Sequence, residues 1–373
     1  MIPFIDLGSQ YRLIQDEVEA AVLRVLRSGQ YILGPEVDAL EEALAQFVGV
    51  RHAVSCASGT DALVMALMAK GVGPGDAVMT TPFTFMASAE AISLVGATPV
   101  FVDVDPRTFN LDPGALGGAV ATARDHLTPR GIIAVDLFGL PADYGAIEQV
   151  ANDHDLFVIE DAAQSFGATH GNRRAGALAS IGATSFFPAK PLGCYGDGGA
   201  LFTDDDELAE LFRSIRVHGQ GSNRYEHVRI GVTGRLDAVQ AAILSVKLKI
   251  LPDELEKRQR VAAAYGLAIQ RAGLQLEIPD VPDGFSSSWA QYSVLAQDAE
   301  ARAACQASLA AAGIPTGIYY PKPLHLQSAF ASLGYSHGDF PVAESLSERI
   351  FSLPIHPYLE DDDIHAIVGA MRI

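Results

Sequence analysis

The chain has 373 residues, 49% of them hydrophobic and 19% charged, which is enough apolar material to bury the core of roughly two domains. This composition excludes a disordered chain, because buried apolar surface can offset the entropy lost on ordering. Lys and Arg total 26 against 45 Asp and Glu, and the net charge of −19 argues against nucleic-acid binding.

The cysteines and the N-terminus predict a cytoplasmic protein. Cys56, Cys194 and Cys305 are widely separated, with the spacing of neither a zinc site nor a disulfide framework. The opening MIPFIDLGSQYRL lacks the basic start and apolar core of a secretion signal. No run of about 18 apolar residues follows, so we expect no membrane span.

The first part of the chain predicts an α/β domain. Amphipathic helices are expected at residues 14–26 and 36–47, joined by the loop GQYILGPEV. From residue 52, short apolar runs alternate with helical patterns such as 61–68 and 144–154. Such runs predict a mostly parallel, seven-stranded sheet covered on both faces. The candidate strands are HAVSC, DAVMT, PVFVDV, GIIAVDL, LFVIED, ATSFF and GALFT.

The pattern changes near residue 250. Helices are expected at Leu236–Lys249 and Asp253–Ala272, leading out of the first domain. WAQYSVLA then predicts a strand, and residues 299–312 a helix, with two more helical segments beyond. We therefore expect a large domain of residues 1–250 and a smaller α+β domain of residues 251–373.

Ligands of open α/β sheets bind beyond the carboxyl ends of the strands, and two predicted strand ends carry suitable groups. In SCASGTDAL, Ser58, Gly59 and Thr60 lead into a helix start whose amides suit a phosphate, although an ordinary helix cap has the same pattern. In LFVIEDAAQSFGA, Glu160 and Asp161 end a strand predicted to be buried. A carboxylate there needs a partner, and a structural helix cap is the alternative.

The most informative stretch is ATSFFPAKPLGCYGDGGALFT. A predicted buried strand leads to Lys190, which Pro188 and Pro191 flank, and a glycine-rich return follows. A partly desolvated lysine has a lowered pKa and suits a Schiff-base nucleophile. Taken alone, a solvated surface lysine is the commoner explanation.

Together these residues supply what pyridoxal phosphate requires. A phosphate cradle, a carboxylate 29 residues before Lys190 and Ser185 just ahead of it form the set. The lysine forms the Schiff base, and Asp161 keeps the pyridine nitrogen protonated. Phe85 follows another predicted strand and is placed either to stack on the ring or to fill the core.

The sequence resembles the fold type I pyridoxal-phosphate sugar aminotransferases of the DegT/StrS-like family, nearly from end to end. Within that family it is most similar to enzymes that aminate the 3-keto form of UDP-N-acetylglucosaminuronic acid. The stretches that carry the resemblance are FIDLGSQY, GQYILGPEVDALE, SGTDAL, TPFTF, GATPVFVDVD, VIEDAAQSFGA, SFFPAKPLGCYGDGGA, RLDAVQAAIL and LPIHPYL.

The resemblance implies roles for individual residues. Lys190 and Asp161 would be catalytic, and the cofactor would be pyridoxal 5′-phosphate, converted to pyridoxamine 5′-phosphate in the half-reaction. The chain would form a homodimer with active sites at the subunit interface, where GVTGRLD reaches the neighbouring cofactor. The implied cofactor contacts are Lys190, Asp161, Gln164, Ser185, Gly59, Thr60, Phe85 and Thr233.

The resemblance also implies substrate contacts, with two departures from the family pattern. Thr233 stands where relatives commonly carry Asn, and Tyr319-Tyr320-Pro321 where many have His-Tyr-Pro. Arg224 is a further candidate positive group for an anionic substrate. The histidines lack metal-ligand spacing, so no metal is expected. The candidate substrate-binding residues are Arg235, Tyr31, Tyr319, Tyr320 and His325, with His356 as a weaker one.

We expect L-glutamate to donate its amino group to a nucleotide-linked keto sugar. The favoured acceptor is a UDP-linked 3-keto sugar such as UDP-2-acetamido-2-deoxy-3-oxo-glucuronate, for the amino sugars of cell-surface polysaccharide such as lipopolysaccharide. A dTDP-linked 3-keto or 4-keto hexose is the nearest alternative. Sugar dehydratases of the family replace the lysine with His, and a non-catalytic regulator would lose the lysine or the acid. Lys190 and Asp161 argue against both.

Overall fold

The computed structural model of the protein describes residues 2–223 and 225–371. Arg224, a candidate contact for an anionic substrate, lies outside the described residues. Among the helices within these ranges, none is long and apolar enough to cross a membrane.

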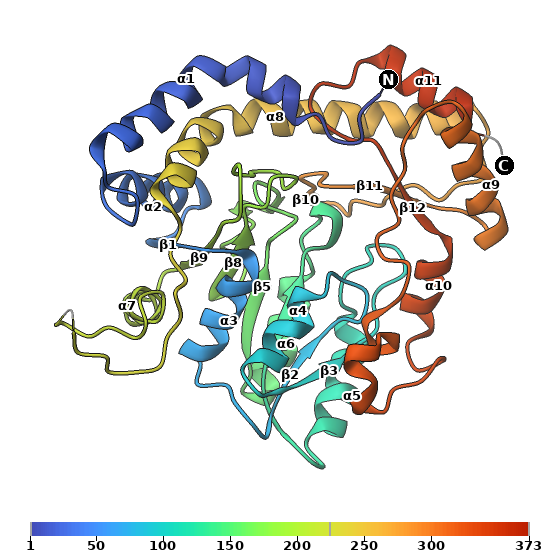
Figure 1. Ribbon diagram of the computed structural model, residues 1–373. Helices are drawn as coiled ribbons and strands as arrows, with labels where there is room; N and C mark the ends of the chain where they lie inside the picture. Colours follow the sequence, from blue (N-terminus) through green and yellow to red (C-terminus); the bar gives the residue numbers. More distant parts are fainter. Residues whose placement is uncertain (1, 224, 372–373) are drawn as a thin grey trace.

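A seven-stranded sheet forms the centre of the larger part of the molecule (Figure 1). Its order is β1-β9-β8-β5-β4-β2-β3, and β9 alone runs antiparallel to its neighbours. Each strand falls on one of the seven predicted apolar runs, so the predicted sheet is confirmed. The strands are β1 (His52–Cys56), β2 (Asp76–Thr80), β3 (Thr98–Phe101), β4 (Thr128–Val135), β5 (Phe157–Asp161), β8 (Ile181–Ser185) and β9 (Gly199–Thr203).

Helices cover both faces of this sheet because successive side chains of each strand point to opposite faces, and both faces are apolar. Val54, Ile133, Ile159 and Leu201 face α3 (Gly59–Ala69), α4 (Ala87–Leu94) and α7 (Asp206–Ile215). The opposite face packs at one end against α5 (Pro113–Ala123) and α6 (Tyr144–His154). At its other end it packs against α1 (Leu7–Ser28), α2 (Pro35–Val48) and α8 (Ala238–Arg271).

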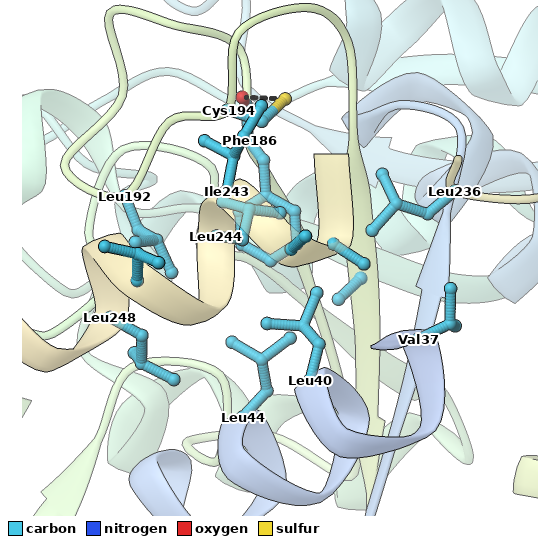
Figure 2. Close-up of a cluster of buried hydrophobic side chains, with 14 of the residues drawn as sticks. Val37, Leu40, Leu44, Phe186, Leu192, Cys194, Leu236, Ile243, Leu244 and Leu248 are labelled. Atoms are coloured by element: carbon cyan, nitrogen blue, oxygen red, sulfur yellow. Dashed lines mark hydrogen bonds between the residues drawn. The ribbon is translucent and has the colours of Figure 1, made fainter. Parts of the chain in front are cut away.

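Helix α8 corrects one prediction. The sequence predicted two helices separated near Pro252, but a single helix of 34 residues runs from Ala238 to Arg271 with Pro252 inside it. Its first half packs on α1 and α2, and its second half on α11 (Asp361–Ala370). Burial on both sides of the proline therefore outweighs its local helix-breaking effect. Figure 2 shows the apolar cluster where α8 closes over α2 and the segment that follows β8.

The C-terminal part contains the predicted strand and helices. β11 (Tyr292–Leu295) pairs antiparallel with β12 (Ile350–Leu353), and α9 (Ala299–Ala311) and α11 pack on this pair. Helix α10 (Pro341–Arg349) leads into β12, while β10 (Phe285–Ser286) joins β6 (Thr169–His170) and β7 (Arg173–Arg174) in a small sheet. Because α8 passes through residue 250 and touches both parts, the domain division at that residue stays a prediction.

Pro252 provides a test of this long helix. Its ring is exposed, so Pro252→Ala removes no packing and lets residue 252 donate a backbone hydrogen bond to Leu248. We expect the free energy of unfolding to rise by about 1 kcal/mol, the regained helix bond outweighing the greater freedom of the unfolded chain. Chemical denaturation would measure the change, with Glu256→Ala on the same helix as control. A less stable Pro252→Ala variant would contradict this account.

Candidate active site

The candidate residues gather at one edge of the main sheet because they follow parallel strands. Ser58 follows β1, Phe85 follows β2, Asp161 ends β5 and Ser185 ends β8. The carboxyl ends of parallel strands share an edge, and this edge is where ligands of open α/β sheets bind.

A close approach of two backbones forms the first part of the site. Gly199 of β9 pairs with Cys56 on one side and Ser185 on the other, which draws the ends of β1 and β8 together. A Cβ atom added to Gly59 would lie 2.7 Å from the Cβ of Ser185, closer than packed atoms come. Only glycine at position 59 leaves the Ser185 hydroxyl beside the start of α3.

The start of α3 is arranged to bind an anion. The Ser58 hydroxyl accepts the amide N–H of Asp61 at 3.0 Å, as a helix cap does. Within the described chain, the amides of Gly59 and Thr60 have no such partner. Together with the Ser185 hydroxyl, these amides and the positive end of the helix dipole suit a phosphate. The start of α3 therefore has both a helix cap at Ser58 and amides that suit an anion.

The Asp161 carboxylate is held at the end of β5 by two hydrogen bonds. The Ser88 hydroxyl donates to Oδ2 at 2.8 Å, and the Ala163 amide donates to Oδ1 at 3.2 Å. Burial raises the pKa of Asp161, although these two bonds and the charge of Lys190 oppose that rise. Sequence reasoning missed Ser88; its place in the helix start after β2 was the available signal.

Lys190 lies in the loop between β8 and β9 and is half-buried. Its backbone N–H donates to the Phe187 carbonyl at 2.9 Å, which folds the loop into a turn. Desolvation lowers the pKa of the Lys190 ammonium, and Asp161 partly opposes this shift. The two side chains therefore lie close enough for each charge to stabilise the other.

Gln164, three residues after Asp161, bonds to an aromatic side chain. Its Oε1 accepts the backbone N–H of Phe138 at 2.8 Å, and its Nε2 donates to the Tyr320 hydroxyl at 3.3 Å. The Tyr320 ring lies 6.4 Å from that of Phe85, whose side chain is 57% exposed. Phe85 is thus available at the surface of the site instead of filling the core.

Tyr319, the other tyrosine of the departure from His-Tyr-Pro, turns toward the N-terminal segment. Its ring lies 6.3 Å from that of Phe4, and burial raises its pKa. The same N-terminal segment, through Ile5 and Asp6, lines a small cavity together with Lys190 and His356. The segment before α1 is therefore part of the site's surroundings, which sequence reasoning did not identify.

The remaining candidates fall into separate groups. Tyr31 is exposed and lies beside the Arg235 segment, because Ile32 bridges to Asp237. Arg235 makes no ion pair with any described residue, so the alternative of a surface salt bridge has no support there.

Thr233 and His325 make contacts of their own within the chain. The Thr233 hydroxyl is 2.9 Å from His218 Nε2, on an exposed segment. His325 is buried, and its Nε2 lies 2.9 Å from Glu344 Oε1. That pairing is typical of a structural histidine, and substrate roles for Thr233 and His325 stay predictions.

The sequence places Glu160 together with Asp161 at one strand end, but Glu160 faces the other side of β5. Its carboxyl oxygens accept the amides of Gly176 at 2.6 Å and Leu178 at 2.7 Å. Burial raises its pKa well above the usual range, as does the nearby Asp136, with which it shares a hydrogen bond. Burial also raises the pKa of Asp136 to about 7. Glu160 is therefore a structural group whose neutral form is favoured by burial.

Comparison with known proteins identifies the class to which this fold and site belong. Residues 12–372 match the DegT/DnrJ/EryC1/StrS aminotransferase family. The chain belongs to this family, which confirms the resemblance predicted from the sequence.

Three relatives align over nearly the whole chain. A UDP-2-acetamido-2-deoxy-3-oxo-D-glucuronate aminotransferase from Pseudomonas aeruginosa is 50% identical, over 100% of this chain and 99% of its own. A pleiotropic regulatory protein from Geobacillus stearothermophilus is 44% identical, over 98% and 96%. A UDP-N-acetyl-3-dehydro-alpha-D-glucosamine 3-aminotransferase from Acidithiobacillus ferrooxidans is 42% identical, over 100% and 97%.

Solved structures share the fold. A DegT DnrJ EryC1 StrS aminotransferase from Brucella abortus superposes with a TM-score of 0.95 at 50% identity, covering 99% of this chain and 98% of that one. NtdA from Bacillus subtilis, with bound cofactor PMP, gives 0.84 at 29% identity, covering 95% and 81%. The predicted fold type is confirmed by this agreement.

The buried carboxyl pair predicts a pH dependence of stability. Glu160 keeps a proton in the folded chain that it loses in the unfolded chain above about pH 4.5. Its contribution to stability is complete below that pH and declines as pH rises toward its raised folded pKa. In Asp136→Asn, the Asn amide can donate to an ionised Glu160, so no proton need be retained. We expect the melting temperature of this variant to fall less than that of the wild type between pH 5 and 8.

Thermal unfolding across that range would measure both slopes. Asp153→Asn, at an exposed position of α6, is the matched control and should follow the wild type. Parallel slopes for Asp136→Asn and the wild type would show that the pair shares no proton.

Proposed function

We propose that the chain is a pyridoxal-phosphate-dependent aminotransferase that moves an amino group from L-glutamate to a UDP-linked 3-keto sugar. The observation that carries the proposal is the meeting of Lys190 and Asp161 at the sheet edge, where each charge shifts the pKa of the other. Desolvated, oppositely charged groups in one site are typical of catalytic machinery.

The residues present fit the cofactor. Ser185 and the open amides of Gly59 and Thr60 would hold the phosphate, at the point where glycine at position 59 lets Ser185 approach the start of α3. Asp161 would pair with the ring nitrogen, and Lys190 would hold the cofactor covalently. Gln164 and Phe85 are the further contacts proposed, for the ring hydroxyl and the ring face. When bound, pyridoxal phosphate supplies an aldehyde carbon and an electron-accepting ring.

The protein groups have distinct tasks in the transfer. Because desolvation lowers the pKa of Lys190, its amine can accept a proton from the carbon that bears the donor's amino group and return it later. Opposite a positive partner, Asp161 would be ionised and would favour a proton on the ring nitrogen. The Ser88 hydroxyl, bonded to Oδ2, fixes the direction of that carboxylate.

The acceptor is proposed from the relatives and from one free cation. Two of the aligned relatives, at 50% and 42% identity, are named as aminotransferases of UDP-linked 3-oxo or 3-dehydro sugars. Arg235 makes no ion pair with any described residue, and its planar guanidinium suits a carboxylate or diphosphate oxygen. We favour UDP-2-acetamido-2-deoxy-3-oxo-glucuronate, with the product destined for cell-surface polysaccharide. Tyr31, Tyr319 and Tyr320 are the proposed neighbours of the sugar.

A homodimer is part of the proposal. The outer face of α1 and the loop after it expose apolar side chains that the single chain does not cover. The chain between α7 and α8 also extends away from the body in Figure 1 and exposes Val228 and Ile230. Thr233 follows on that segment, where it could meet a neighbour's cofactor in place of the Asn of relatives. The exposed residues of the α1 region are Leu13, Leu23, Leu26, Tyr31 and Ile32.

The function is tested with the purified protein, the cofactor, glutamate and a panel of UDP- and dTDP-linked keto sugars. We expect mass spectrometry to show amine gain in the UDP-linked 3-keto sugar. Formation of 2-oxoglutarate without any amino sugar would refute the acceptor and leave the chemistry intact. Amination of a dTDP sugar alone would replace the proposed substrate.

Lys190→Ala tests the chemistry without relying on turnover. The wild type should show the near-visible absorption of lysine-bound cofactor, and borohydride should fix the cofactor to the Lys190 peptide. Both signals should disappear in Lys190→Ala. Persistence of the absorption in the variant, or a cofactor fixed elsewhere, would remove Lys190 from its proposed role.

Gly59→Ala tests the phosphate cradle. Its added Cβ would press on Ser185 at 2.7 Å, so we expect the Kd for pyridoxal phosphate to rise at least about tenfold, or 1.4 kcal/mol. Titration monitored by absorbance would measure the Kd. Gly118→Ala in α5, where a Cβ meets nothing within 4 Å, is the control. An unchanged Kd in Gly59→Ala would place the phosphate elsewhere.

A further inference from the structure

Lys247 is a buried lysine that the proposed reaction does not use. Its side chain is on α8 and only 2% exposed. The helix segment around it contributes Ile243, Leu244 and Leu248 to the apolar cluster of Figure 2. Leu192, from the loop that carries Lys190, belongs to the same cluster. A charged side chain is thus buried at the edge of a hydrophobic core.

Among the described residues, no carboxylate is in direct contact with this ammonium. No ion pair within 4.0 Å joins Lys247 to any described acidic residue. Its Nζ instead donates to the backbone carbonyl of Gly193 and lies 4.9 Å from the centre of the Tyr195 ring. Burial lowers the pKa of Lys247 to about 8, while Glu254 and Cys194 oppose the shift.

Such an arrangement is unfavourable for stability. Removing an ammonium from water costs free energy. One hydrogen bond to a carbonyl and one aromatic contact do not fully offset that cost. An apolar residue of similar length would fill the same space among Leu and Ile side chains. Residues that break a local rule in this way are expected at functional positions.

The group that Lys247 holds is the loop of Lys190. Gly193 is three residues after Lys190, and there the loop folds back so tightly that an added Cβ would lie 2.5 Å from the Pro188 carbonyl oxygen. The Cys194 amide donates to the Phe186 carbonyl at 2.8 Å and closes the loop at its base. Lys247 thus bonds to the part of the loop that runs back from Lys190 to β9. Lys190 itself lies at the turn of this loop.

A second side chain of α8 holds Tyr195, two residues further along the loop. Gln240, two helical turns before Lys247, accepts the Tyr195 amide at 2.9 Å and donates to the Tyr195 carbonyl at 3.3 Å. Side chains of α8 therefore hold both Gly193 and Tyr195, in the part of the loop that runs back to β9. Because α8 is itself packed on α1, α2 and α11, it provides a rigid support.

We propose that Lys247 is a positioning residue that holds the loop of Lys190 in the geometry required for amino-group transfer. The inference rests on the proposed function, in which the Lys190 amine must reach its proton partner within a few tenths of an ångström. Rate losses of roughly 10²-fold follow displacements of about 1 Å in such sites. Lys247 acts through the loop and contacts neither substrate nor cofactor.

Lys247→Met removes the charge and keeps the length of the side chain. We expect kcat, counted per cofactor-loaded site, to fall at least about tenfold, with the KM values for both substrates within about twofold of the wild type. Loading is measured from the near-visible absorption of each preparation. Lys257→Met on the same helix, whose exposed ammonium pairs with Asp253 at 2.7 Å, is the control and should retain the wild-type kcat. A kcat per loaded site within twofold of the wild type would overturn the proposal.

Hydrogen exchange of the cofactor-free protein gives a readout that does not depend on turnover. In Lys247→Met, the amides of residues 187–196, apart from Pro188 and Pro191, should exchange at least about tenfold faster, while those of the sheet strands stay unchanged. The melting temperature should stay equal or rise, because the desolvated ammonium is gone. Unchanged exchange in the loop would refute the positioning role. Faster exchange in a protein whose wild type aminates no sugar would instead count against the proposed function alone.

Discussion

The attraction between Lys190 and Asp161 is the interaction on which the site depends. Each side chain is partly or wholly removed from water, and burial alone would drive both toward their neutral forms. Their mutual attraction keeps the charged forms accessible at the same edge of the sheet. A cofactor with a basic ring nitrogen and an aldehyde can exploit both groups, because Asp161 favours a positive partner and Lys190 can lose its proton.

The sheet places these groups through one antiparallel strand. β9 lies between β1 and β8 and begins at Gly199, where a Cβ would lie 2.5 Å from the Ser58 carbonyl oxygen and 2.8 Å from that of Thr184. This crowding brings the start of α3 to the end of β8. Gly199 is therefore required by the close approach of the backbones at this edge of the sheet, because no side chain would fit there.

Much of this could be predicted from sequence, since the informative signals were local. Apolar runs identified the seven strands, and the lysine between two prolines identified the central loop. Other features depend on contacts between residues far apart in the chain, which local sequence patterns do not predict. Pro252 should end a helix, yet packing on both sides carries α8 through it. Glu160 and Asp161 are adjacent, and only the alternation of β5 assigns one to the structure and the other to the site. Ser88 and the Phe4–Tyr319 contact likewise depend on tertiary proximity.

The groups around the site have a common physical character. Glu160, Asp136 and Lys247 are buried, ionisable and costly to desolvate, and apolar residues could replace them in a core selected for stability alone. Asp136 directly follows β4, Glu160 lies in β5, and Lys247 supports the loop after β8 from α8. Polar groups in low dielectric hold a single geometry, because every alternative leaves a buried donor or acceptor without a partner. A reaction that depends on where one amine lies benefits from such directional contacts more than from closer apolar packing, which tolerates small displacements.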